Sequence, residues 1–199
     1  MAKKTTTATK KAEKAKVETL VPSAEAKVQI SGAILTYQHE PHLNKNIAEN
    51  TLTEEQSVCV GMLDKAMKVL PDMELNRITI PAVLDEFLKQ AKVSNITDLV
   101  GKTVKNVPYM STTKNILYDI VKRRYGLGLT KPVCFVIHTE GKAKGIDVEE
   151  ALNAEGYGGG QMARQREVIL ARGTEFRVGK YVIGDEFGEV YPIIHLYAM

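Results

Sequence analysis

The second half of the chain is divided by glycines into short segments of apolar and β-branched residues. These segments cover residues 165–170, 174–178, 181–183 and 190–197. The glycines that separate them are Gly173, Gly179, Gly184 and Gly188. Segments of this length and composition, with glycine turns between them, are typical of β-strands. We therefore expect the chain beyond residue 160 to form a sheet.

Helical patterns dominate the first half of the chain. Thr53 and Gln56 stand three residues apart, as in a capping box, and apolar residues follow at helical spacing as far as Pro71. Pro81 suits the first turn of a second helix, and residues 117–121 carry the inward face of a third. We therefore expect helices to form most of this half.

Two strands are expected among these helices. Residues 75–81 alternate briefly and are β-branched, and residues 132–139 form an apolar run that suits a strand buried on both faces. A chain with helices mainly in its first half and strands mainly in its second half is typical of an α+β fold. We expect N-terminal helices followed by two small packed β-sheets.

The positive charge of the chain is concentrated at its beginning. The formal net charge is +3, and residues 1–16 hold six lysines against one glutamate, so the remainder of the chain is slightly acidic. A lysine-rich segment with few apolar residues cannot bury enough surface to fold alone. We expect a disordered basic tail over residues 1–27 and one globular domain over residues 28–199. The tail either keeps the chain soluble or anchors it weakly to a nucleic acid or an acidic partner.

The thiols and imidazoles do not form the pattern of a redox or metal site. Cys59 and Cys134 are far apart in apolar surroundings, which predicts two buried thiols and a reducing compartment. His39 and His42 are close together but have no further ligands nearby, so no metal is expected. No apolar run is long enough to span a membrane, and no signal core precedes the domain, which predicts a cytoplasmic protein without membrane contact.

Polar residues interrupt the expected strands at three places. Gln165 and Glu167 alternate along the strand expected over residues 165–170, so their side chains would share one face, about 7 Å apart. Arg77 lies in an otherwise apolar strand, and residues 111–113 supply three neighbouring hydroxyls. Each feature alone also has an ordinary structural explanation. The Gln165 and Glu167 pair would lie on a solvent-exposed strand face, Arg77 would be a surface charge on an edge strand, and residues 111–113 would form a helix N-cap.

The order of these residues resembles a known pattern. Arg77, the Ser-Thr-Thr run 111–113 and the Gln-x-Glu pair are similar to the Arg–Ser-Thr-Ser–Glu pattern of toxin-type mono-ADP-ribosyltransferases. That branch includes clostridial actin- and Rho-modifying toxins and phage-encoded transferases. The segments "LTYQHEPHLNKNIAENTLTEEQ", "LVGKTVKNVPYMSTT" and "REVILARGTEFRV" are also similar to segments of the family, so the resemblance covers about residues 30–197. It implies an ADP-ribosyltransferase-like catalytic domain over residues 28–199, with NAD as the substrate.

The resemblance implies a role for each of these residues. Glu167 would accept a hydrogen bond from a ribose hydroxyl and stabilise an oxocarbenium-like transition state. Ser111 would brace Glu167, and Arg77 would hold the pyrophosphate of NAD with charge-assisted bonds. Gln165 would orient the nucleophile of the acceptor. Because Gln165 stands where arginine-modifying members carry glutamate, the resemblance favours an acceptor side chain other than arginine.

Two further groups follow from the same resemblance. Thr112 and Thr113 would line the NAD pocket beside Ser111. Arg123 and Arg124 would line it as well, although a solvated helix end is the alternative for both arginines. The turn that faces the acceptor would consist of Tyr157, Gly158, Gly159, Gly160 and Gln161.

The resulting prediction is a mono-ADP-ribosyltransferase that cleaves NAD and modifies a macromolecule. The acceptor would be a host protein, with a nucleic acid as the less favoured choice, and the site of action would be the cytoplasm of a host or target cell. Three alternatives stay open: an NAD glycohydrolase, a non-catalytic binding or virion protein that keeps the fold, and a nucleic-acid-binding protein led by the basic tail. No GxGxxG segment follows a strand, so a Rossmann mode of NAD binding is not expected.

Overall fold

The computed structural model describes residues 24–127, 132–157, 166–185, 188 and 190–199, of which residues 24–29 are described as backbone only. Its helices are α1 (Ala24–His39), α2 (Leu43–Glu49), α3 (Glu54–Ala66), α4 (Pro81–Ala91), α5 (Ile96–Leu99), α6 (Leu117–Gly126) and α7 (Val148–Asn153). Its strands are β1 (Lys68–Val69), β2 (Glu74–Thr79), β3 (Thr103–Asn106), β4 (Met110–Thr113), β5 (Val133–His138), β6 (Lys144–Asp147), β7 (Glu167–Leu170), β8 (Thr174–Gly184) and β9 (Tyr191–Ala198). The tail expected over residues 1–27 overlaps α1 by residues 24–27, and the character of residues 1–23 stays a prediction.

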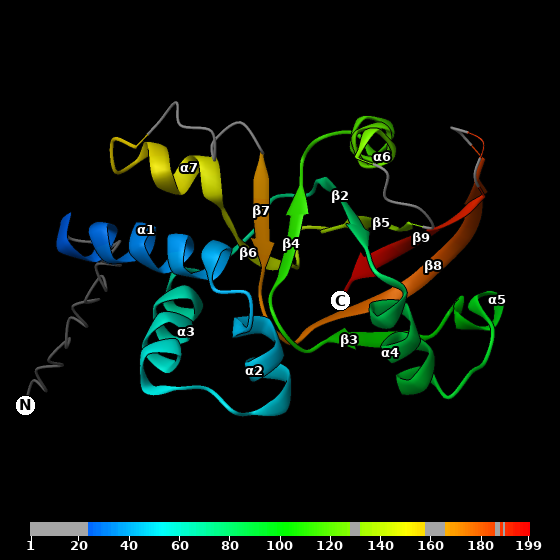
Figure 1. Cartoon of the computed structure of the whole chain (residues 1–199), viewed down its shortest axis with the longest axis horizontal. Coiled ribbons are helices and arrows are strands. Elements are labelled where there is room, and N and C mark those ends of the chain that lie inside the picture. Colours follow the sequence, from blue (N-terminus) through cyan, green and yellow to red (C-terminus); the bar gives the residue numbers. More distant parts are fainter. Residues whose placement is uncertain (1–23, 128–131, 158–165, 186–187, 189) are drawn as a thin grey trace, which may run out of the picture.

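The strands of the described residues form one curled sheet in the order β1-β6-β7-β4-β2-β5-β9-β8-β3. Figure 1 shows α1, α3 and α7 beside the end of the sheet that contains β6 and β7, and α4 and α5 beside the end that contains β3. Two groups of strands meet where β2 pairs with β4, and this contact has the single Cα pair Asn76–Thr113. The α+β class is confirmed, and the two small sheets expected from the sequence are joined at this narrow junction.

The local signals of the first half are present in the structure. α3 begins with a complete capping box, in which Thr53 Oγ1 accepts from the Gln56 N–H and Gln56 Oε1 accepts from the Thr53 N–H. α4 starts with Pro81 at its first position. α3 ends at Ala66, before the expected end at Pro71, because the chain leaves the helix to pair β1 with β6.

One long strand, β8, replaces two shorter strands that were expected on either side of Gly179. β8 shifts its register on β9 between Val178 and Lys180 but continues as a strand. A Cβ atom at Gly179 would lie 2.1 Å from the ring of Tyr197, so a larger residue does not fit there. This glycine therefore marks a close approach within one strand and not a turn between two.

Apolar side chains pack in clusters on both sides of the sheet. The largest cluster includes the stacked rings of Phe87 from α4 and Phe135 from β5. A second cluster joins α1, α3 and α7 to β6 and β7, and a third, around Val121, lies under α6. Val168 belongs to the first cluster and Ile169 to the second. The strand that bears Glu167 is therefore packed on both of its faces.

Both thiols are buried, as predicted, and neither Cys59 nor Cys134 forms a disulfide. Cys59 packs in the cluster under α1 and α3, and Cys134 packs under α6. Within the described ranges, no group of three or more potential metal ligands occurs. None of the helices formed by these residues has the length and apolar character needed to cross a membrane.

Candidate active site

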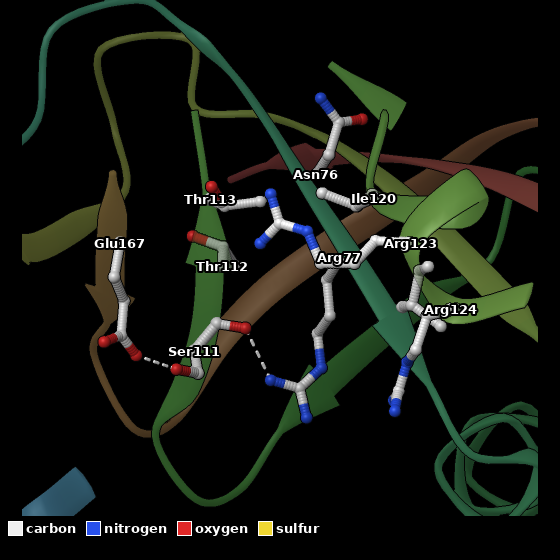
Figure 2. Close-up of a pocket in the computed structure, with 10 residues that line it drawn as sticks. Asn76, Arg77, Ser111, Thr112, Thr113, Ile120, Arg123, Arg124 and Glu167 are labelled. Carbon is white, nitrogen blue, oxygen red and sulfur yellow. Dashed lines mark hydrogen bonds between the residues drawn. The ribbon is translucent and has the colours of Figure 1, made fainter. Parts of the chain in front are cut away.

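Three adjacent strands bring the predicted site residues together. Arg77 lies on β2, Ser111 on β4 and Glu167 on β7, and these strands follow one another in the order β7-β4-β2. The ladder places Thr113 opposite Glu167 and Asn76 opposite Thr113. Figure 2 shows the three side chains of Arg77, Ser111 and Glu167 in one chain of contacts. Segments that are far apart in the sequence thus form one polar site.

Glu167 is buried and bound at both carboxylate oxygens. Its exposed fraction is 7%. Ser111 Oγ donates to Oε1, and Gln38 Nε2 donates to Oε2 at 2.5 Å. A buried carboxylate needs such donors because it has lost its water shell. The two bonds together fix the orientation of the carboxylate.

Arg77 is tied to the same serine on its other side. Arg77 Nη1 donates to the Ser111 carbonyl at 2.5 Å, so Ser111 contacts both charged residues. Burial lowers the pKa of Arg77, and the charges of Tyr37 and Glu167 oppose this shift. A guanidinium nevertheless stays charged in a protein. Because β2 is an interior strand, the alternative of a surface charge on an edge strand is wrong for Arg77.

The hydroxyls of residues 111–113 do not act as one group. Ser111 is directed at Glu167, whereas the buried Thr112 donates to the Val168 carbonyl at 2.7 Å. The difference follows from the alternation of side chains along β4. Of these two neighbouring hydroxyls, that of Ser111 reaches the carboxylate, and that of Thr112 fastens β4 to β7.

Thr113 ends β4 and shapes the turn toward α6. Its hydroxyl accepts from the Asn115 N–H at 3.1 Å. α6 begins at Leu117, and its N-cap Ile116 makes no side-chain capping bond. The alternative that the Ser-Thr-Thr run is a helix N-cap is therefore wrong, because the run forms a strand.

A hollow of about 320 Å³ opens over these strands. Its lining consists of Asn76, Arg77, Ile78, Ser111, Thr112, Thr113, Ile120, Arg123, Arg124 and Glu167. Figure 2 shows Glu167 on one side and the Arg77 and Arg124 side chains on the other. Arg123 and Arg124 come from the last turn of α6, so the predicted solvated helix end also borders the hollow. Guanidinium groups facing a carboxylate across a hollow suit a ligand that carries charges of both signs.

Sequence reasoning did not single out the residues of α1 and α2 that surround Glu167. Tyr37 is 8% exposed, its hydroxyl accepts from Asn44 Nδ2 at 3.4 Å, and burial raises its pKa. Gln38 bonds to Glu167. Gln38 lies four residues after the fully buried Ile34, but this burial is visible only in the structure, and the sequence of α1 has no clear apolar face that would have indicated it.

The strand that bears Glu167 starts later than expected. β7 begins at Glu167, and Arg166 has a φ of 49°, in the left-handed region. A strand over residues 165–170 is therefore wrong at its start, because a left-handed residue ends the extended ladder. Alternation along one strand consequently gives no argument that Gln165 and Glu167 share a face.

Several predicted residues of the acceptor-facing turn fall outside the described residues. These are Gly158, Gly159, Gly160 and Gln161; Gln165, which was predicted separately to orient the acceptor, also lies outside the described residues. Tyr157 is described and is 60% exposed, with its N–H donating to the Leu152 carbonyl at 3.0 Å. The predicted turn therefore follows α7, and the roles assigned to its residues stay predictions.

The fold is similar to that of several solved structures. Plx2a, an ADP-ribosyltransferase toxin from Paenibacillus larvae, has 16% identity and a TM-score of 0.60, with 88% of this chain and 86% of that chain covered. C3stau2 from S. aureus with NAD has 18% identity and a TM-score of 0.58, with 89% and 90% covered. Exoenzyme S from Pseudomonas aeruginosa, bound to carba-NAD and in complex with human 14-3-3 protein beta, has 17% identity and a TM-score of 0.55, with 86% and 73% covered.

Neither protein-family models nor curated proteins give a match to the sequence. The structural likeness nevertheless extends over most of the chain and defines the class of fold. The chain has the fold of the ADP-ribosyltransferase toxins. The resemblance inferred from Arg77, residues 111–113 and Glu167 is confirmed at the level of the fold.

Proposed function

We propose that the protein is a mono-ADP-ribosyltransferase that takes ADP-ribose from NAD and transfers it to a protein acceptor. The observation that carries the proposal is the chain of contacts Arg77–Ser111–Glu167 across three adjacent strands, in one charged hollow. The fold supports it, because proteins with the same fold have been solved with NAD and with carba-NAD.

The proposed reaction breaks the bond between ribose C1′ and the nicotinamide nitrogen. Nicotinamide leaves as a neutral molecule with the bonding electron pair, and positive charge develops on the ribose. The acceptor nucleophile then bonds to C1′ and releases a proton. A fixed carboxylate stabilises this charge in the transition state more than it stabilises NAD, so it lowers the barrier. We assign this role to Glu167, whose carboxylate is already oriented by two donors.

The arginine side of the hollow suits the pyrophosphate of NAD. Arg77 uses Nη1 on the Ser111 carbonyl, and its buried Nε has no partner among the described residues. A buried donor without a partner is a reason to expect a ligand acceptor nearby. Arg123 and Arg124 border the same hollow and would add charge-assisted bonds to phosphate oxygens.

The acceptor is proposed to be a host protein, modified in the cytoplasm of a host or target cell. Several proteins with this fold are toxins. Gln165, two residues before Glu167, is proposed to orient the nucleophile of the acceptor, as the sequence resemblance implies. An amide can do so by hydrogen bonding but cannot remove a proton, so the acceptor group must react without a strong base at this position.

The decisive experiment incubates the protein with labelled NAD, first alone and then with bacterial and eukaryotic lysates. Labelled macromolecules are identified by mass spectrometry, and free ADP-ribose and nicotinamide are quantified in parallel. We expect labelled protein that is absent with the Glu167→Gln variant. Free ADP-ribose without labelled macromolecules would show that water is the acceptor. Intact NAD in every lysate would contradict the proposal.

A further inference from the structure

Glu167 receives its second hydrogen bond from a part of the chain that the resemblance does not include in its site pattern. Gln38 lies in the last turn of α1, 129 residues before Glu167 in the sequence, and its Nε2 donates to Glu167 Oε2. Ser111 binds the other oxygen, Oε1, from β4. The carboxylate is thus held between a strand residue and a helix residue.

The chemistry of the partner sets the orientation of the Gln38 amide. A carboxylate oxygen accepts hydrogen bonds and donates none, so the NH₂ end of the amide faces Glu167. The carbonyl end, Gln38 Oε1, is then left buried without a partner among the described residues. An unpaired buried acceptor lowers stability. A residue present for packing alone would be apolar here, so the amide points to a role in the site.

The surroundings of Gln38 keep its side chain in place. One helical turn earlier, Ile34 is fully buried, and the neighbouring Tyr37 is 8% exposed. The Tyr37 ring meets the Tyr109 ring edge to face, with centroids 5.7 Å apart. α1 is also tied to α3, where the Cys59 thiol donates to the Ala33 carbonyl at 3.5 Å. Because α1 is held by these contacts, the Gln38 donor is fixed in position to bind Glu167.

We propose that Gln38 is a positioning residue that sets the catalytic geometry of the Glu167 carboxylate. This inference rests on the proposed function, because it assigns Gln38 an effect through Glu167 on NAD cleavage. With one donor on each oxygen, the carboxylate can neither rotate nor tilt freely. Without the Gln38 donor, Ser111 is the remaining side-chain donor to Glu167 among the described residues. The Glu167 carboxylate can then move away from the positive charge that develops on the ribose. A shift of about 1 Å in a reacting group can cost up to about 100-fold in rate.

The test compares Gln38→Leu and Gln38→Glu with wild type in steady-state cleavage of labelled NAD. Leucine keeps the size of the side chain without the donor, and glutamate puts a second carboxylate against Glu167. We expect kcat to fall about 10-fold in Gln38→Leu and further in Gln38→Glu, while KM changes less than about 3-fold. The matched control is His39→Leu, an exposed neighbour on the same helix, which should leave kcat and KM unchanged.

A double variant separates positioning from a general structural role. If Gln38 acts through Glu167, Gln38→Leu should lower kcat no further in a Glu167→Gln background. A structural defect would lower kcat by the same factor in both backgrounds, and this result would overturn the inference. So would a kcat of Gln38→Leu equal to that of the wild type. A wild type that cleaves no NAD would remove the proposed function and, with it, this assignment. Active wild type with an unaffected Gln38→Leu would remove the assignment of Gln38 alone.

Discussion

The Lys114 ammonium lies 2.8 Å from a carboxylate oxygen of Asp147, the residue that caps α7. Lys114 directly follows the Ser-Thr-Thr run, and its backbone N–H donates to the Arg166 carbonyl at 2.9 Å. One residue therefore connects the end of β4, the start of α7 and the residue before Glu167. The Lys114 and Asp147 side chains are only 20% and 18% exposed, so this ion pair is shielded from solvent.

Lys114→Met should destabilise the fold by about 1–2 kcal/mol, between the values for exposed and buried pairs, because Asp147 is left partly buried without its cation. Urea unfolding at neutral pH measures the change. The matched control is Lys142→Met, because the pair between Lys142 and Glu140 is 55% and 38% exposed. That control should change the unfolding free energy by less than about 0.5 kcal/mol. Equal effects of both variants would show that shielding at Lys114 has no energetic consequence.

Glu167→Gln should reduce NAD cleavage on the order of 10²–10³-fold, because an amide of the same shape carries no charge to stabilise the ribose cation. NAD affinity should change far less, since the charge matters most in the transition state. Single-turnover cleavage and calorimetric binding provide the two measurements. Cleavage within a factor of about three of wild type would remove Glu167 from the mechanism.

Arg77→Lys should weaken NAD binding while leaving the melting temperature within a few degrees of wild type. Lysine keeps the positive charge but loses the planar fork that binds two phosphate oxygens at once. Calorimetric titration with NAD measures the effect. Arg172→Lys is the control, because Arg172 pairs with Asp64 and is not part of the hollow lining. An unchanged Kd for Arg77→Lys would indicate that Arg123 or Arg124 holds the pyrophosphate.

Stability should fall when the pH drops from about 6.5 toward 4, and His195 should contribute to the fall. Burial lowers the pKa of His195 from 6.5 to about 4, with further lowering from Lys180 and His138. The unfolded chain therefore binds more protons than the folded chain between these values, so stability is full above pH 6.5 and is lost as the pH falls toward 4. Urea midpoints at pH 7.5 and 4.5 should differ less for His195→Phe than for wild type. Parallel pH dependence in both proteins would argue against this contribution.

Local signals predicted the elements that depend on neighbouring residues. The Thr53–Gln56 capping box and Pro81 at a helix start act through bonds and angles within one turn, so they can be read from the sequence. The apolar strand 132–139 was predictable for a similar reason, because its side chains are buried on both faces. The resemblance also placed Arg77 and Glu167 in one site, and the structure brings them to one hollow from the two strands on either side of β4.

Other features depend on contacts that local patterns do not encode. The bond between Gln38 and Glu167 joins residues 129 positions apart, and nothing near either residue specifies the other. The start of β7 depends on the left-handed backbone of Arg166, a conformation that an arginine rarely adopts. The single strand β8 was divided in the prediction because Gly179 suggests a turn, whereas the ring of Tyr197 above it is the reason that a side chain does not fit.

The last strand of the sheet, β9, lies between β5 and β8 and is parallel to β5. β5 in turn supports β2, the strand of Arg77, through a ladder from Glu74 to Thr79. A chain interrupted before Tyr191 would leave β5 and β8 with open edges and would divide the sheet into two pieces. During synthesis on the ribosome, the strand of Arg77 therefore gains its full support only after residues up to Ala198 have emerged. The residues that line the hollow thus leave the ribosome before the strand that completes the sheet beneath Arg77.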